Sequence, residues 1–330
     1  MYEKIWDRPD VYFVEAPVVS YAIKATNCFV VVDGDQSLVI DTASRCEKDF
    51  DRILQVIDEL DLRKGDVSFF ITHMHYDHMG LLDDLAERTD RVFVGRHEYA
   101  QSLPDGRMRY CSHIDTRFLE EGVPLSDVRR YRKLREINLD TFRGEHNYVF
   151  VGGGDYIRIG SIELQVLETP GHTQGHLALY EPFSRLLFCG DNIVYEFSPA
   201  LDCFADGSDS VAAYLGSLKS MKALPFEYAM QSHGKLFQDA RARIAQLEAH
   251  HAMREAGLLE AVRCCPCSCG YDLICHYADN DSSVRVHSAP ISPKYVFVKE
   301  CSCHLEHMVS EGILTRFRDD GGIYRYQVLR

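Results

Sequence analysis

The stretch THMHYDHMG, residues 72–80, follows the apolar run VSFFI and holds three histidines and an aspartate within six positions. His73 and His75 are two positions apart, so on an extended segment leaving a strand their side chains project to the same side. Asp77 and His78 reach the space beside them if the chain then turns. Surface histidines on a loop are the alternative, but histidine fills only 15 of 330 positions, so this spacing rarely arises by chance. The motif therefore predicts a metal site at the end of a buried strand.

Further potential ligands follow later apolar runs. The segment TPGHTQGH supplies His172 and His176, CGDNIV supplies Asp191, and SHGK supplies His233. Each stands near a glycine, which permits the tight turns that aim a side chain at a site. Neutral imidazoles with a few carboxylates suit zinc, with iron or manganese as alternatives, because such donor sets bind several first-row metals. No cysteine is required, which argues against a purely structural thiolate site.

The order HMHYDH, TPGHTQGH, CGD and an isolated histidine resembles the metallo-β-lactamase superfamily over about residues 10–240. The resemblance implies an αββα sandwich with two divalent metal ions at one edge. By position, the first ion is held by His73, His75 and His172, and the second by Asp77, His78 and His233, with Asp191 as the bridge. Because the second histidine of the first motif is not a glutamate, the resemblance favours a hydrolase over the flavodiiron redox branch.

The resemblance also implies how such a hydrolase works. A metal-bridging hydroxide attacks a carbonyl or phosphoryl group, and Asp77 orients or deprotonates this nucleophile. No G-x-S-x-G motif offers a competing serine nucleophile. Tyr195, four residues past Asp191, is a candidate donor to the developing oxyanion, with simple aromatic packing as the alternative. His176 falls outside the seven ligands, and we expect it to support the site structurally.

Strand and helix patterns along the chain indicate an α/β fold. The runs VYFVEAPVV, CFVVV and LVIDTA predict an antiparallel start to a sheet. Apolar residues three and four positions apart predict an amphipathic helix over 47–60. The alternation of predicted strands and helices along the chain suits an α/β sandwich. We expect a catalytic domain over residues 1–244 with an insertion at about 99–148.

The composition becomes helical near residue 240. A helix is predicted over 239–262, and the tail predicts another helix followed by a hairpin that turns at DDGG. We expect residues 245–330 to form a smaller, mainly helical and winged-helix-like domain.

Charge bears on the substrate. The formal net charge is −14, which gives no support to tight capture of a nucleic-acid backbone or an anionic membrane. The basic run RRYRKLR, 129–135, is interpreted as a solvated helix face. The first hypothesis is a hydrolase of a small-molecule thioester, ester or lactone. The alternative is a metal-dependent endoribonuclease or phosphodiesterase, and a non-catalytic DNA-binding regulator is less favoured.

Twelve cysteines are present, and those after position 263 are clustered. Cys264, Cys267, Cys301 and Cys303 could form a second, structural metal site, with a redox pair or ordinary reduced thiols as alternatives. The N-terminus lacks a signal-peptide pattern and no segment has the length of a membrane helix, so the expected location is the cytoplasm. A homodimer is an expectation without a specific motif behind it.

Overall fold

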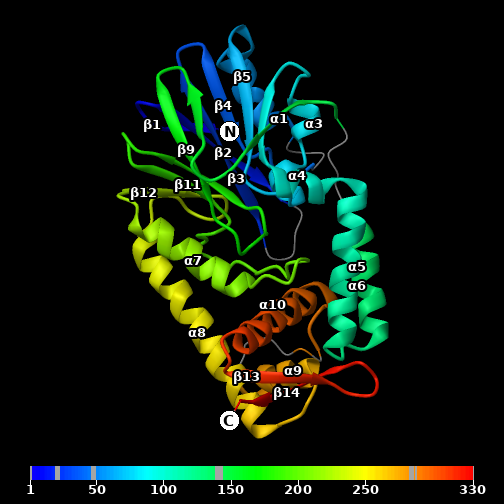
Figure 1. Cartoon of the computed structure of the whole chain (residues 1–330). Helices are drawn as coiled ribbons and strands as arrows, with labels where there is room; N and C mark the ends of the chain where they lie inside the picture. The colour runs from blue at the N-terminus through cyan, green and yellow to red at the C-terminus, as the bar shows by residue number, and fades with distance from the viewer. Residues whose placement is uncertain are drawn as a thin grey trace. The chain divides into compact units, whose positions relative to one another are not determined.

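The computed structural model describes residues 2–18, 23–45, 50–137, 144–281, 286 and 288–329. The chain forms two compact units (Figure 1). The first unit comprises Met1–Pro104, Asp140–Pro199 and Ser217–Ile244, and the second comprises Asp105–Leu139, Ala200–Gly216 and Ala245–Arg330. Most of the predicted insertion and the tail thus fall in the same unit.

Two mixed sheets build the first unit. The seven strands of the first sheet lie in chain order: β1 (Tyr2–Trp6), β2 (Asp10–Pro17), β3 (Ala25–Asp33), β4 (Gln36–Ile40), β5 (Asp66–Ile71), β6 (Arg91–Gly95) and β7 (Asn147–Val151). Strands β1 to β4 pair antiparallel and β4 to β7 pair parallel, which confirms the predicted antiparallel start.

The second sheet has the order β12-β11-β10-β9-β8. Its strands are β8 (Tyr156–Ile159), β9 (Ile162–Glu168), β10 (Leu177–Glu181), β11 (Leu186–Gly190) and β12 (Tyr228–Gln231). Strands β8 to β11 pair antiparallel, whereas β11 and β12 pair parallel. Parallel pairing needs a long crossover, so the ends of several strands meet at one edge.

Alternation of side chains along the strands creates two apolar layers. Between the sheets, Phe29, Phe70 and Phe188 pack in one buried cluster, with the rings of Phe29 and Phe188 5.4 Å apart. On the outer face of the first sheet, helix α1 (Phe50–Glu59) buries Ile53 and Ile57. Full burial of each such side chain stabilises the fold by about 1.5–3 kcal/mol. The predicted helix 47–60 is therefore confirmed from Phe50, and residues 47–49 lie outside the described part of the chain.

Short helices lie between the parallel strands β4 to β7. These are η1 (Leu62–Lys64), α2 (Tyr76–Met79), α3 (Leu82–Leu85) and α4 (Arg96–Ser102). Helix α2 begins inside the HMHYDH motif, so the chain turns where the motif requires it.

The second unit is mainly helical. Its elements are α5 (Pro104–Glu120), α6 (Leu125–Ile137), most of α8 (Ala240–Cys264), α9 (Gly270–Asp281), α10 (Ile291–Ser310), β13 (Leu314–Arg318) and β14 (Tyr324–Val328), and α7 (Ser210–Ala223) begins in it. The antiparallel pairing of β13 and β14 confirms the hairpin predicted at DDGG. Buried Tyr326 of this hairpin donates its hydroxyl proton to Glu121 at 2.7 Å. Arg129, Arg130, Arg132 and Lys133 of the basic run are exposed on α6, which agrees with the predicted solvated helix face, whereas Tyr131 is buried.

The clustered cysteines do not converge. Cys301 and Cys303 are buried, whereas Cys264 and Cys267 are exposed, and the Cys303 sulfur lies 3.0 Å from that of Cys203 instead. Within the described ranges, no cysteine belongs to a group of three or more neighbouring metal-ligand candidates. The four-thiolate alternative for a structural metal site is therefore wrong for these residues, because helix α10 turns its thiols into the core.

One partly buried ion pair of the second unit makes its stability depend on pH. His307 on α10 donates through Nδ1 to Asp209 at 2.7 Å, and the Ser310 hydroxyl donates to the same carboxylate. This contact raises the pKa of His307. Although burial alone would raise the pKa of Asp209, its hydrogen bonds lower that pKa to about 2.

His307→Gln should destabilise the protein more at pH 5 than at pH 9. A raised histidine pKa stabilises the fold below the unfolded value of 6.5, and that contribution is lost as pH rises through the folded pKa. The lowered pKa of Asp209 contributes above 3.8 and is lost only as pH falls towards 2. Urea unfolding of the wild-type chain and of His307→Gln at pH 5 and pH 9 measures the loss of unfolding free energy at each pH. Equal losses at the two pH values would contradict the prediction.

No helix in the described part of the chain combines the length and the apolar character that a membrane span requires.

Candidate metal centre

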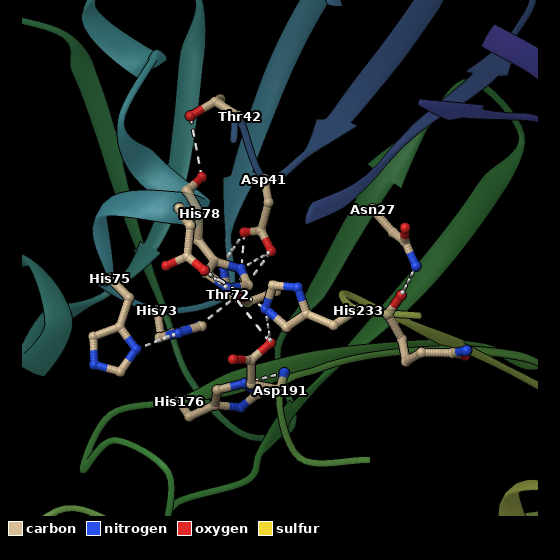
Figure 2. A network of polar contacts seen from close by, with 12 residues as sticks. Asn27, Asp41, Thr42, Thr72, His73, His75, His78, His176, Asp191 and His233 are labelled. Atoms are coloured by element: carbon tan, nitrogen blue, oxygen red, sulfur yellow. Dashed lines mark hydrogen bonds and ion pairs between the residues drawn. The ribbon is translucent and has the colours of Figure 1, made fainter. Parts of the chain in front are cut away.

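The predicted ligands converge in the first unit. Figure 2 shows five of them, His73, His75, His78, Asp191 and His233. The predicted ligands come from the segment after β5, the loop between β9 and β10, the end of β11 and the loop after β12. The seven residues in question are His73, His75, Asp77, His78, His172, Asp191 and His233. Each falls in at least one group whose ligand atoms lie within 4.8 Å of one another.

Three histidines form the first group. His75 Nδ1 lies 2.9 Å from Nε2 of His73 and 3.0 Å from Nε2 of His172. Burial and the neighbouring histidines hold the pKa of His73 well below its ordinary value, so its imidazole is neutral. The Thr72 hydroxyl lies 3.0 Å from His73 Nδ1 and hydrogen-bonds to the Asp41 carboxylate. A hydroxyl that donates to Asp41 accepts from His73, so the lone pair of His73 is on Nε2 and points into the group.

Asp191 lies between the first group and a second one. Its Oδ2 is 3.4 Å from Nε2 of His172, while its Oδ1 is 3.4 Å from Nε2 of His78 and 3.2 Å from Nε2 of His233. Asp77 Oδ2 lies 3.6 Å from the same nitrogen of His233. Burial alone would raise the pKa of Asp191, but His233 and His78 hold it well below its usual range, so the carboxylate is ionised.

Among the residues that the structure describes, four buried polar atoms at Asp191 and the second group have no hydrogen-bond partner. They are Oδ2 of Asp77, Nε2 of His78, Oδ1 of Asp191 and Nε2 of His233. Each buried polar atom without a hydrogen-bond partner lowers the stability of the fold by about 1–3 kcal/mol. A divalent cation among them would satisfy all four, because imidazole nitrogens and carboxylate oxygens are the donors that such ions prefer. The residues therefore fit a metal ion at this second group as well as at the first.

Contacts behind the ligands orient their rings. His78 donates through Nδ1 to Asp41 at 2.8 Å, and His233 donates through Nδ1 to the Ala25 carbonyl at 2.8 Å. Asn27 donates to the carbonyls of Gln231 and Gly234, which holds the loop that carries His233. These contacts leave Nε2 of both histidines free to face inward. Our sequence reasoning missed Asp41, although it directly follows the buried strand β4 beside β5, as the ligands follow their own strands.

Glu98 on α4 ties two ligand loops together. It is fully buried, and its Oε2 accepts from the Met74 amide at 2.7 Å. Its Oε1 accepts from the Thr173 hydroxyl at 2.9 Å and the Gly175 amide at 2.8 Å. The loops that carry His73 and His172 are thus held by one carboxylate. The sequence offered no signal for this residue, because a glutamate on a short polar helix is ordinarily solvated.

His176 supports the backbone at Asp191. Its Nε2 accepts from the Asp191 amide at 3.2 Å, and its Nδ1 lies 2.8 Å from the Thr169 hydroxyl. Burial lowers the pKa of His176 to about 3, so the ring is neutral. These contacts agree with the structural role expected from the sequence. Gly190 packs against this ring with φ of 53°, and a Cβ there would lie 2.5 Å from Nε2 of His176.

Gly190→Ala should therefore displace Asp191 and destabilise the first unit by about 2–4 kcal/mol, because it adds both a left-handed backbone penalty and a clash with the buried ring. Urea unfolding measures the stability, and metal content per chain reports the displacement. Gly154→Ala is the matched control, since Gly154 also has positive φ but has open space around it. Equal losses in both variants would mean that the backbone penalty alone acts.

Tyr195 is engaged elsewhere in the first unit. Its hydroxyl donates to the carbonyl of Gln238 at 2.9 Å. Its use as an oxyanion donor stays a prediction. In that role the hydroxyl would have to give up its hydrogen bond to the Gln238 carbonyl.

A cavity of about 490 Å³ adjoins the centre at His233. Its apolar lining includes Ile5, Phe13, Phe197 and Leu236, and its charged lining comprises Glu3, Glu15, Lys24, Glu196 and Lys235. The size is that of a small-molecule site, and the charges are mixed rather than basic.

Comparisons with known proteins agree with this arrangement. The family profile described as Metallo-beta-lactamase superfamily matches residues 23–233. An atrochrysone carboxyl ACP thioesterase of Aspergillus chevalieri is 23% identical over 264 residues, which cover 77% of this chain and 68% of that protein. A hydroxyacylglutathione hydrolase of Cereibacter sphaeroides is 37% identical over 92 residues, which cover 28% of this chain and 34% of that protein.

A solved structure resembles the chain along its length. It is a beta-lactamase domain protein from Burkholderia ambifaria, with a TM-score of 0.81 at 23% identity. The match covers 99% of this chain and 94% of the other. At 23% identity, this structural similarity is evidence for the fold alone.

Proposed function

The chain belongs to the metallo-beta-lactamase superfamily, and from that premise we propose that it hydrolyses a small-molecule thioester, ester or lactone at a centre for two divalent cations. Homologues in this superfamily are hydrolases, and the chain is an enzyme of that kind. The observation that carries the proposal is the pair of ligand groups around Asp191, one of which shares His233 with a cavity of small-molecule size.

The proposed ligand assignment follows the two groups. His73, His75 and His172 would hold one cation, Asp77, His78 and His233 would hold the other, and Asp191 would contribute to both. Zinc suits these donors, with iron or manganese as alternatives. When bound, the two cations supply Lewis acidity that activates water and polarises a carbonyl or phosphoryl group.

Asp77 is proposed as the residue that handles the proton of the attacking water. Its Oδ2 is buried, has no hydrogen-bond partner and faces the Nε2 atoms of His78 and His233 at 3.8 and 3.6 Å. A carboxylate oxygen in this position can accept a hydrogen bond from water, orient it and take its proton. Asp41 and the Ala25 carbonyl keep the two imidazoles fixed while the proton moves, because each accepts from an Nδ1–H.

The adjoining cavity supports an acyl substrate. Phe13, Phe197 and Leu236 offer an apolar wall for a hydrocarbon portion, and Lys24 and Lys235 offer cations for a polar or anionic end. A thioester is the leading candidate, because the names of two relatives state thioester chemistry or a glutathione conjugate. Both relatives are distant, so the leaving group is part of the proposal.

Hydrolysis of RNA is the second candidate function. The exposed basic face of α6 is the observation on its side. Against it, three carboxylates and two ammonium groups line the cavity at His233, which is a poor surface for a phosphate backbone.

The test is a hydrolysis panel on the purified, metal-loaded chain. Acyl-glutathione and acyl-carrier thioesters, a lactone, a simple ester and a single-stranded RNA are assayed in parallel, with total metal measured per chain. We expect about two metals at the centre and turnover of a carbonyl substrate. RNA cleavage that falls steeply with salt, without carbonyl turnover, would replace this function with the second candidate.

Residues 245–330 are proposed to form a winged-helix-like domain. The order of α8, α9, α10 and the hairpin β13–β14 supports this, because a winged helix uses three helices followed by a two-stranded wing. A cytoplasmic location and a homodimer stay predictions.

A further inference from the structure

A separate cluster of potential metal ligands lies inside the second unit. His251 comes from α8, while Glu300 and His304 come from α10. One ligand atom of each lies within 4.8 Å of the others, and all three side chains are buried. Glu300 and His304 are four positions apart, so they share one face of their helix. Two helices therefore present two imidazoles and a carboxylate to one point.

The distance between the imidazoles resembles that in the candidate metal centre. His251 Nδ1 lies 3.1 Å from His304 Nε2, compared with 2.9 Å between the ring nitrogens of His73 and His75. On its other side, His304 Nδ1 lies 3.3 Å from a carboxylate oxygen of Glu255. A histidine whose outer nitrogen donates to a carboxylate presents its inner nitrogen as a lone pair, which is the usual support of a metal-bound imidazole.

A hydrogen bond between the two histidines does not give every polar atom of the cluster a partner. Since His304 Nδ1 donates to Glu255, His304 Nε2 carries a lone pair. His251 can donate to it only from Nδ1, and then His251 Nε2 is an acceptor that is buried and has no partner. If His251 carries its proton on Nε2 instead, two lone pairs face each other at 3.1 Å, beside a carboxylate. A cation between them removes that repulsion and uses all three donor atoms, whereas Nε2 of His251 has no partner among the described residues in either arrangement.

The local charge permits a cation. Arg254 pairs with Glu300, which lowers the attraction for a second positive charge. Glu255 adds another carboxylate next to His304, but its Oε1 also lies 3.7 Å from Nε2 of His307, so two carboxylates stand against one guanidinium and one imidazole. We therefore expect weaker binding here than at Asp191.

We propose that His251, Glu300 and His304 bind a further divalent metal ion of the first transition row, with Zn²⁺ as the best match to two imidazoles and one carboxylate. Because the three side chains are buried, the role is structural: the ion fastens α8 to α10. The site is independent of hydrolysis and uses no residue of the proposed catalytic centre.

The experiment compares zinc content among full-length variants. The wild-type chain, His304→Gln and the control His276→Gln are loaded with Zn²⁺, desalted and analysed for metal per chain. His276 is the matched control because it is a histidine of the second unit, on α9, outside the cluster. We expect His304→Gln to bind one zinc fewer than the wild-type chain while keeping its hydrolytic turnover, and the control to match the wild-type chain in both. Equal zinc in wild type and His304→Gln would overturn the proposal.

A second measurement does not depend on a variant that folds. Crystals of the zinc-loaded chain are measured at the zinc absorption edge, and an anomalous peak is expected between His251, Glu300 and His304. Peaks around Asp191 without one at His304 would refute the structural metal site and leave the proposed function intact. A peak at His304 without any around Asp191 would support the structural site and refute the dinuclear centre.

Discussion

Asp191→Ala is expected to remove metal from both ligand groups and to lower hydrolytic turnover on the order of 1000-fold. The two oxygens of this carboxylate face different groups, Oδ2 towards His172 and Oδ1 towards His78 and His233. The substitution removes a carboxylate that would serve both cations, and a loss of about 4 kcal/mol in transition-state stabilisation corresponds to roughly 1000-fold in rate.

Total metal per chain and steady-state turnover of the best substrate in the panel measure this effect. Asp35→Ala is the control, because Asp35 is an exposed aspartate in the turn after β3 of the same unit. A variant that keeps the metal content of the wild-type chain and full turnover would show that Asp191 is not a ligand, while leaving the family assignment untouched.

Glu98→Ala should weaken both the first unit and its hold on metal. The substitution leaves three donors of Met74, Thr173 and Gly175 without their acceptor. At about 1–3 kcal/mol for each buried group, we expect a loss of about 3–5 kcal/mol in the free energy of unfolding. Since these donors belong to the loops of His73 and His172, metal affinity should fall about 10–100-fold.

Urea unfolding of the metal-free chain and competition with a chelator separate the two effects. Glu98→Gln should lie between wild type and Glu98→Ala, because the amide keeps one acceptor oxygen and replaces the other with a donor. Glu163→Ala, at an exposed position of β9, is the control. If Glu98→Ala binds metal as tightly as the control, the two loops do not need this carboxylate to hold their histidines.

Much of the candidate site could be predicted because its pattern is local. The spacing of His73, His75, Asp77 and His78 directly after a buried strand can be recognised within nine residues. The structure brings these four together with His172, Asp191 and His233. The helix α1, the helix α8 and the hairpin β13–β14 were also predicted, since each follows from side-chain periodicity or turn composition within one segment.

The remaining features depend on contacts between distant segments. Glu98 joins Met74 to Gly175, and His251 meets His304 across 53 positions of sequence. Likewise, the clustered cysteines separate because α10 buries its own thiols and leaves Cys264 and Cys267 exposed. Periodicity tells which face of an element is apolar, but not which other element covers that face. The sequence by itself therefore determined the metal-binding chemistry and the α/β class, whereas tertiary packing decided which polar side chains are buried together and so support the centre or form a second one.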